Sequence, residues 1–96
     1  NMKFMINWTV HEDKRHEVLQ TFGSMTPEDD AAQRGPSMTQ IGRWHEPVSG
    51  TGVAIVEADS MDTVTAFLLN WNHVCDIEVT PVLDDAETRA VVQSLS

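Results

Sequence analysis

Four stretches of this chain have the residue pattern of β-strands, and no other feature limits its fold as strongly. They are residues 3–10, Met38 to His45, Val53 to Ala58 and Val74 to Val82. In the first stretch, Phe4, Ile6 and Trp8 alternate with Met5 and Asn7. We therefore predict four strands.

Glycine and proline indicate how these strands are arranged. Gly50-Thr51-Gly52 separates the second and third stretches, and glycines in so short a connection favour a β-hairpin. Pro81 lacks the N–H that a central strand uses, so it favours an edge position for the last stretch. The second and third strands are expected to pair antiparallel, with the fourth at an edge.

Two helical patterns lie between the strands. Asp13 is placed to cap the first helix and Gly23 to end it, while Ser60 is placed to cap the second. Each helix has one apolar face, formed by Val18, Leu19 and Phe22 in the first and by Val64, Phe67, Leu68 and Trp71 in the second. Both faces are expected to pack on the sheet.

Two shorter segments carry helix-start signals. Thr26-Pro27-Glu28-Asp29 offers a capping hydroxyl, a proline at the first helical position and acidic residues in the first turn. It predicts a short helix or an ordered loop that ends at Gly35-Pro36. Asp84-Asp85-Ala86-Glu87 predicts a C-terminal helix that carries Val91, Val92 and Leu95.

The order β-α-β-β-α-β is that of the ferredoxin-like α+β fold, here with an extra C-terminal helix. We expect one domain over residues 2–96, with both main helices on one face of a four-stranded antiparallel sheet. The other face is then bare, although the strands carry apolar residues on both sides. A homodimer that pairs two such faces is the expected solution.

Charge and cysteine content restrict the possible partners and compartment. Six Lys and Arg against fifteen Asp and Glu give a net charge of −9, which argues against nucleic acid and anionic membrane surfaces as partners. The single Cys75 excludes an internal disulfide, and no apolar leader precedes the first strand. We expect a cytoplasmic protein with no cofactor that leaves a motif.

Several motifs along the chain are similar to those of a known family. They are Met2-Lys3-Phe4-Met5-Ile6, Gly42-Arg43-Trp44-His45, Gly50-Thr51-Gly52-Val53-Ala54-Ile55 with Glu57-Ala58-Asp59, and Leu69-Asn70-Trp71-Asn72 through Val79-Thr80-Pro81-Val82-Leu83-Asp84-Asp85. Together they resemble a group of short bacterial proteins known only as a domain of unknown function, over nearly the whole chain.

That group is more distantly similar to the dimeric α/β-barrel superfamily, which includes antibiotic-biosynthesis and haem-degrading monooxygenases. The resemblance implies a dimeric barrel fold and almost no chemistry. Some of those monooxygenases place an Asn, a Trp and a His around an aromatic substrate, and this chain has Asn7 on its first strand. The matching Trp and His are missing at the corresponding places, so that site is not carried over.

Arg43, Trp44 and His45 form the densest cluster of candidate functional residues. Alternation places Arg43 and His45 on one face of the second strand and Trp44 on the other. An Arg can hold a carboxylate while a nearby His moves a proton near neutral pH, so both are candidate catalytic residues. An edge strand with an ion pair, for example to Glu57, is the structural alternative.

A second polar cluster, Asn70, Trp71, Asn72 and His73, follows the second main helix. Capping and the helix dipole explain an Asn and a His at such an end, yet the same groups could line the mouth of a pocket. Four scattered histidines give no metal-ligand spacing. Cys75 shares a strand face with Ile77 and Val79, which favours a buried, inert thiol.

The leading hypothesis is a small-molecule binding or catalytic homodimer with a pocket between sheet and helices. Arg43 and His45 are its expected catalytic groups, and the expected substrate-binding residues are Asn7, Trp8, Glu57, Asn70, Trp71 and His73. Core packing is the alternative for both tryptophans. If Phe4, Ile6 and Trp8 face the helices, Asn7 leaves the pocket. The alternatives are a non-enzymatic structural or regulatory homodimer and a cofactor-free or haem-degrading monooxygenase.

Overall fold

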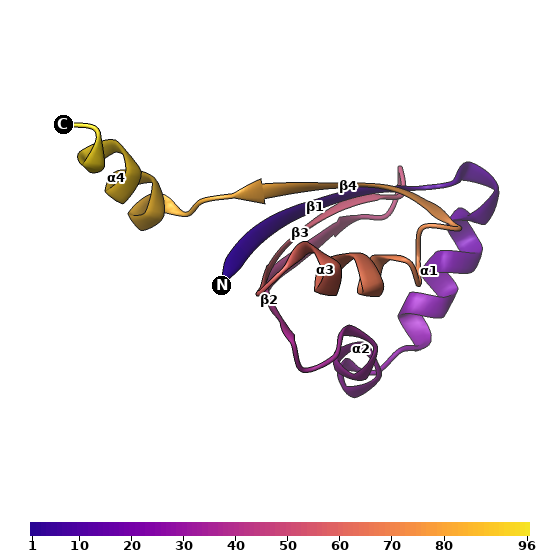
Figure 1. Cartoon of the computed structure of the whole chain (residues 1–96). Coiled ribbons are helices and arrows are strands. Elements are labelled where there is room, and N and C mark those ends of the chain that lie inside the picture. Colours follow the sequence, from indigo (N-terminus) through magenta and orange to yellow (C-terminus); the bar gives the residue numbers. More distant parts are fainter.

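The computed structural model describes the whole chain, residues 1–96 (Figure 1). Its elements are β1 (Met2–Val10), a 3₁₀ turn (Glu12–Lys14), α1 (Arg15–Ser24), α2 (Pro27–Arg34), β2 (Met38–Glu46), β3 (Thr51–Ala58), α3 (Met61–Leu68), β4 (Cys75–Val82) and α4 (Asp85–Ser94). All four predicted strands and the predicted helices are present. The segment after Thr26, predicted as a short helix or an ordered loop, is a helix.

The four strands form one antiparallel sheet in the order β2-β3-β1-β4. This order and the β-α-β-β-α-β succession confirm the ferredoxin-like fold. β2 and β4 are the edge strands, in agreement with the edge position predicted from Pro81. The pairing of β2 with β3 shifts by one residue between Gln40 and Gly42, which leaves Ile41 at a β-bulge.

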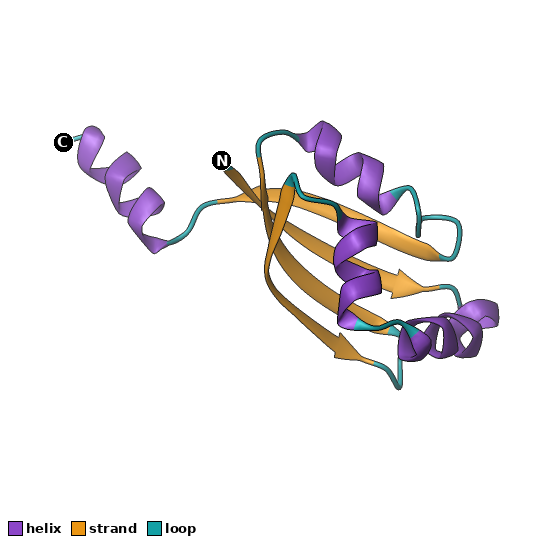
Figure 2. Ribbon diagram, turned by 90° about the horizontal axis from the view of Figure 1, so that it is seen from below, coloured by secondary structure: helices purple, strands orange, loops and turns teal.

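Three helices, α1, α2 and α3, lie on the same side of the sheet, whereas α4 projects beyond the end of β4 (Figures 1 and 2). Phe4 and Ile6 of β1 are buried beneath these helices together with Val56 of β3 and Val64 of α3. The more apolar set of β1 therefore faces the helices. Asn7, which belongs to the other set, faces away from them.

Helix boundaries differ from the predictions in three places. Asp13 is not a helix cap, because it lies in the 3₁₀ turn and α1 starts at Arg15 without a capping side chain. Gly23 lies within the last turn of α1. Ser60 occupies the N-cap position of α3, but its hydroxyl makes no capping hydrogen bond. The capping signals at Thr26 and Asp84 are confirmed, since each forms a full capping box.

The sheet face opposite the helices, here called the open face, is not covered by any part of the chain (Figure 1). Only ten of 96 residues are buried, so much apolar surface stays accessible. Met5 pairs with Ile55 and Trp44 with Val53 on this face, and Trp44 is 59% exposed. No helix is both long and apolar enough to cross a lipid bilayer.

Candidate functional site

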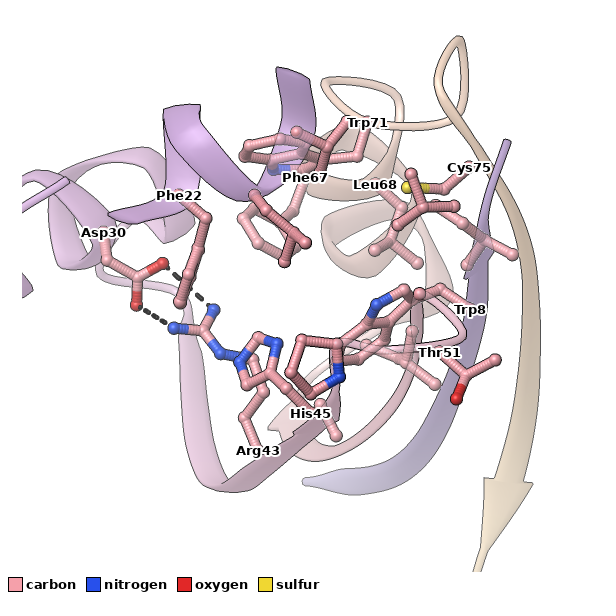
Figure 3. A pocket seen from close by; sticks show the side chains of 18 of the residues that line it. Trp8, Phe22, Asp30, Arg43, His45, Thr51, Phe67, Leu68, Trp71 and Cys75 are labelled. Atoms are coloured by element: carbon pink, nitrogen blue, oxygen red, sulfur yellow. Dashed lines mark hydrogen bonds and ion pairs between the residues drawn. The ribbon is translucent and has the colours of Figure 1, made fainter. Parts of the chain in front are cut away.

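A cavity of about 110 Å³ lies between the sheet and helices α1 to α3 (Figure 3). Thirteen of its twenty lining residues are hydrophobic. They come from the middle of the sheet, from α1 and from the segment around the end of α3, and include Ile6, Phe22, Ala54, Phe67 and Leu68. The lining of the cavity is thus as apolar as a hydrophobic core, apart from a few polar side chains at one side.

The imidazole of His45 packs against two aromatic side chains that line this cavity. It lies 4.7 Å from the ring of Phe22 and 5.5 Å from that of Trp8, measured between ring centres. The contact with Trp8 is edge-to-face, a favoured aromatic arrangement. The side chain remains partly exposed, so His45 stands at the mouth of the cavity with access to both solvent and interior (Figure 3).

Partial burial lowers the pKa of His45 below its ordinary value of 6.5, and the positive charge of Arg43 lowers it further. The carboxylate of Asp30 acts in the opposite direction but does not reverse the shift. His45 is therefore predominantly neutral at pH 7. A neutral imidazole has one nitrogen free to accept a hydrogen bond or a proton, whichever tautomer is present.

Arg43 is held by a bidentate ion pair with Asp30 of α2. Its two terminal nitrogens donate to the two carboxylate oxygens of Asp30, each at 3.0 Å, and Arg34 donates to the same carboxylate at 2.8 Å. The guanidinium carbon of Arg43 also lies 4.9 Å from the centre of the Phe22 ring. The ion pair proposed with Glu57 is wrong, because Glu57 lies on the open face and pairs with Lys3 at 3.5 Å.

These contacts fix the charge state of Asp30. Its partial burial alone would raise the pKa, but the hydrogen bonds from Arg43 and Arg34 outweigh burial and lower it below the ordinary 3.8. Asp30 is thus ionised at neutral pH and neutralises Arg43. An arginine with both terminal nitrogens already paired is a poor anchor for a second carboxylate, so the arrangement suits an uncharged ligand.

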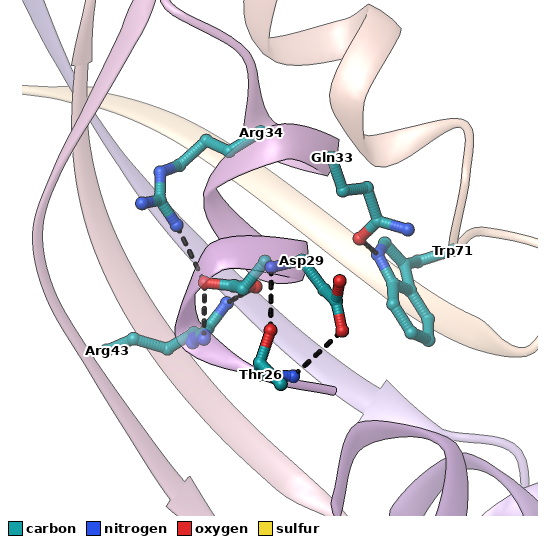
Figure 4. A network of polar contacts seen from close by, with 7 residues as sticks. Thr26, Asp29, Gln33, Arg34, Arg43 and Trp71 are labelled. Carbon is teal, nitrogen blue, oxygen red and sulfur yellow. Dashed lines mark hydrogen bonds and ion pairs between the residues drawn. The ribbon is translucent and has the colours of Figure 1, made fainter. Parts of the chain in front are cut away.

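α2 is joined to the rest of the fold by polar contacts from its two sides (Figure 4). Asp30 binds Arg43 of β2, and the side-chain oxygen of Gln33 accepts a 2.8 Å hydrogen bond from the indole nitrogen of Trp71. α2 has no buried residue. These polar contacts therefore hold α2 against the cavity, beside Trp71.

Comparison with known proteins places this chain in a family. A family model described as a domain of unknown function (DUF3303) matches residues 2–96. The chain belongs to the DUF3303 family. No curated protein matches it.

The fold brings together half of the predicted site residues. Arg43, His45, Trp8 and Trp71 all line the cavity. The two tryptophans therefore combine core packing with a place in the cavity wall, and Arg43 and His45 share one strand face as predicted.

The other predicted residues lie outside this cavity. Asn7 faces the open side of the sheet, because Trp8 and Ile6 take the helix-facing positions. Glu57 shares the open face. Asn70 and His73 are exposed after α3, and the Asn70 amide donates to the carbonyl of Phe67. The capping interpretation fits Asn70 better than the pocket interpretation.

Two polar residues beside the cavity were missed by sequence reasoning. The sequence predicts Asp30 only as a carboxylate near the start of a helix, and it predicts no role for Gln33. The spacing of Asp30 and Arg34, four apart on a helix, was the one available signal, since such pairs commonly form ion pairs. Nothing in the sequence indicates that Gln33 meets Trp71, 38 residues away.

The remaining reactive groups do not form a site of their own. Burial raises the pKa of the Cys75 thiol, and the charge of Asp76 adds to this shift, so the thiolate form is disfavoured. No three His, Cys, Asp or Glu side chains lie close enough together to hold a metal ion. His45 is the group best placed for chemistry.

Proposed function

We propose that this protein binds a small uncharged organic molecule, about the size of one aromatic ring, in the cavity between the sheet and α1 to α3. The observation that carries the proposal is the apolar cavity of about 110 Å³ with a neutral imidazole at its mouth. An apolar cavity of roughly 150 Å³ accommodates benzene, so the size suits a single ring with a small movement of the walls.

His45 is the proposed polar recognition group. Its free nitrogen accepts a hydrogen bond from a hydroxyl of the ligand while Phe22 and Trp8 contact the ring. In the enzymatic form of this proposal, the same nitrogen removes a proton from the bound molecule. Arg43 then keeps the His45 pKa low and Asp30 keeps Arg43 in place, so both are positioning residues.

Haem is a poor fit to this cavity. A four-ring macrocycle exceeds a space of single-ring size, and His45 packs between Phe22 and Trp8. Asn7, the only residue that resembled the monooxygenase site, points to the opposite face of the sheet. The haem-degrading alternative therefore has no support from these residues.

The test compares phenol with benzoate, which have the same ring but differ in charge. Phenol is expected to quench the fluorescence of Trp8 and Trp71 in a saturable way. Benzoate is expected to bind much more weakly, because its charge loses water and Arg43 is already paired. Equal or tighter binding of benzoate would contradict the proposal and restore Arg43 as an anion anchor.

A variant pair separates His45 from general effects on the protein. His45→Gln is expected to weaken phenol binding about three- to tenfold, the usual range for one neutral hydrogen bond, and to leave toluene binding nearly unchanged. His73→Gln is the matched control, since His73 is exposed and outside the cavity. Weakening by both variants alike would mean that His45 does not contact the ligand.

A second candidate function is a cytoplasmic homodimer that pairs the open faces of two copies and has a structural or regulatory role. The exposed Trp44 and the neighbouring Val53 and Ile55 favour it, because sheet faces of this kind are normally covered. Trp44→Asp places a charge in the centre of that surface. It is expected to give a monomer in sedimentation velocity, whereas unchanged association would exclude pairing through this face.

A further inference from the structure

The C-terminal helix α4 carries an apolar stripe that meets no part of its own chain. Val91, Val92 and Leu95 are 50%, 59% and 81% exposed. With Thr88 they occupy positions i, i+3, i+4 and i+7, which lie on one side of a helix. Figures 1 and 2 both show α4 standing away from α1, α2 and α3.

The start of α4 is fixed in place even though its stripe is free. Asp84 and Glu87 form a capping box, and Lys3 of β1 lies 3.4 Å from Asp84 and 3.1 Å from Glu87. The ion pairs join the first turn of α4 to β1. A ten-residue helix is only marginally stable in water without a packing surface, so a surface that covers the stripe would stabilise α4.

We propose that α4 docks on a second copy of this chain, with each copy receiving the α4 of the other. This rests on the pairing of open faces proposed above. Four strands about 4.8 Å apart and about eight residues long give an open face of roughly 500 Å². A stable interface buries roughly 800 Å² on each partner, so the sheet alone falls short.

An exchanged helix supplies the missing area. Ten residues rise about 15 Å along a helix about 10 Å wide, and each copy both gives one helix and receives one. The exchange therefore adds roughly 300 Å² per copy. Only Leu83 and Asp84 separate α4 from β4, so α4 begins next to the sheet whose open face would contact the same partner.

The second copy is favoured over an unrelated partner because both uncovered apolar surfaces belong to one chain. A two-fold axis makes such a contact reciprocal, so that the α4 of each copy meets the same region of the other. The net charge of −9 opposes this association, so contact must come from apolar side chains. Salt screens the repulsion, and the dimer is expected to become tighter as ionic strength rises.

Two full-length variants that add the same charge test the exchange. Val92→Asp places a carboxylate within the stripe, and Gln93→Asp places one on the other side of α4. Sedimentation equilibrium is expected to show that Val92→Asp raises the dimer dissociation constant about tenfold or more, while Gln93→Asp matches the unchanged protein. Circular dichroism checks that both variants stay folded, as expected for exposed positions.

The outcomes separate the exchange from the pairing of sheets. If Val92→Asp associates as tightly as Gln93→Asp while Trp44→Asp is monomeric, the sheets pair and the α4 proposal is wrong. If the unchanged protein is monomeric, both proposals are wrong. A benzophenone amino acid at position 92 gives a second measurement: a covalent dimer is expected, and a product within one chain would overturn the exchange.

Discussion

Asp30 and Arg43 face each other across the edge of the cavity, joined by two parallel hydrogen bonds of 3.0 Å each. The pair connects α2 to the edge strand β2. Their side chains are only 13% and 18% exposed, which places the pair between a surface ion pair and a fully buried one. It therefore contributes to both the position of α2 and the charge balance of the cavity.

Replacing Asp30 with asparagine is expected to lower the free energy of unfolding by about 1–3 kcal/mol, because charge-assisted hydrogen bonds are lost and Arg43 stays largely buried. Urea unfolding measures the effect. Glu28→Gln is the control, since it removes a charge from the same helix at an exposed position that makes no ion pair. A loss no larger than that of the control would show that the pair is not stabilising.

The stabilisation that Asp30 gives to the folded protein should be lost at low pH. Its pKa is lower in the folded protein than the ordinary 3.8, so the unfolded chain binds its proton first as the pH falls. The stabilisation is fully present above the ordinary value and is lost as the pH falls through the folded-state pKa. The difference in stability between the unchanged protein and Asp30→Asn should shrink over that range and stay constant near pH 7.

His45 is expected to titrate below 6.5 in the folded protein, because burial and Arg43 disfavour its charged form. Proton NMR of the imidazole signals measures this, and His45→Gln identifies the signal by its loss. As the pH falls through 6.5, the unfolded chain takes up this proton before the folded one, so His45 makes the protein less stable on acidification. A folded-state pKa at or above 6.5 would contradict the arrangement around Phe22 and Trp8.

The influence of Arg43 on His45 has its own test. Arg43→Met keeps much of the side-chain length and removes the positive charge. The pKa of His45 should rise, because one of the causes that lower it is gone and the carboxylate of Asp30 remains. An unchanged or lower pKa in this variant would mean that burial alone sets the shift.

Features that depend on near neighbours in the sequence could be predicted, and features that depend on packing could not. The capping boxes at Thr26 and Asp84 each involve a residue three positions away. Strand alternation placed Arg43 and His45 on one face. The contact between Asp30 and Arg43 depends on how α2 lies over β2, which no local pattern specifies.

The face of the sheet occupied by Asn7 illustrates an intermediate case. Alternation gives two sets of β1 residues without saying which one meets the helices. The difference in polarity between the two sets indicates which one faces the helices, since Phe4, Ile6 and Trp8 are far more apolar than the set that holds Asn7. The position of α4 lies at the other extreme, because its capping signal predicts a helix and nothing about what it packs against.

Alanine substitutions at two glycines of the sheet test how tightly Trp8 is packed in the cavity wall. A methyl group at Gly52 would overlap the ring of Trp8, and one at Gly42 would overlap the ring of Trp44. Trp44 is exposed and has space to move, whereas Trp8 is packed against His45 and the cavity. Gly52→Ala is therefore expected to cost about 1–3 kcal/mol of stability and to change the tryptophan fluorescence, with a clearly smaller cost for Gly42→Ala. Equal costs would show that Trp8 is as free to move as Trp44.

The hydrogen bond between Trp71 and Gln33 should control the mobility of α2. Trp71→Phe keeps an aromatic ring in the cavity wall and removes the indole donor, so Gln33 of α2 loses its hydrogen bond to the segment after α3. Because the bond is solvent-exposed, we expect a loss of only about 0.5–1 kcal/mol in stability, together with faster hydrogen exchange confined to residues 27–34. Trp44→Phe is the control, because the Trp44 indole is exposed on the open face and forms no hydrogen bond within the chain. If exchange in α2 is unchanged while Asp30→Asn accelerates it, the ion pair alone holds the helix. If exchange rises equally throughout the chain, Trp71 supports the core and not α2 in particular.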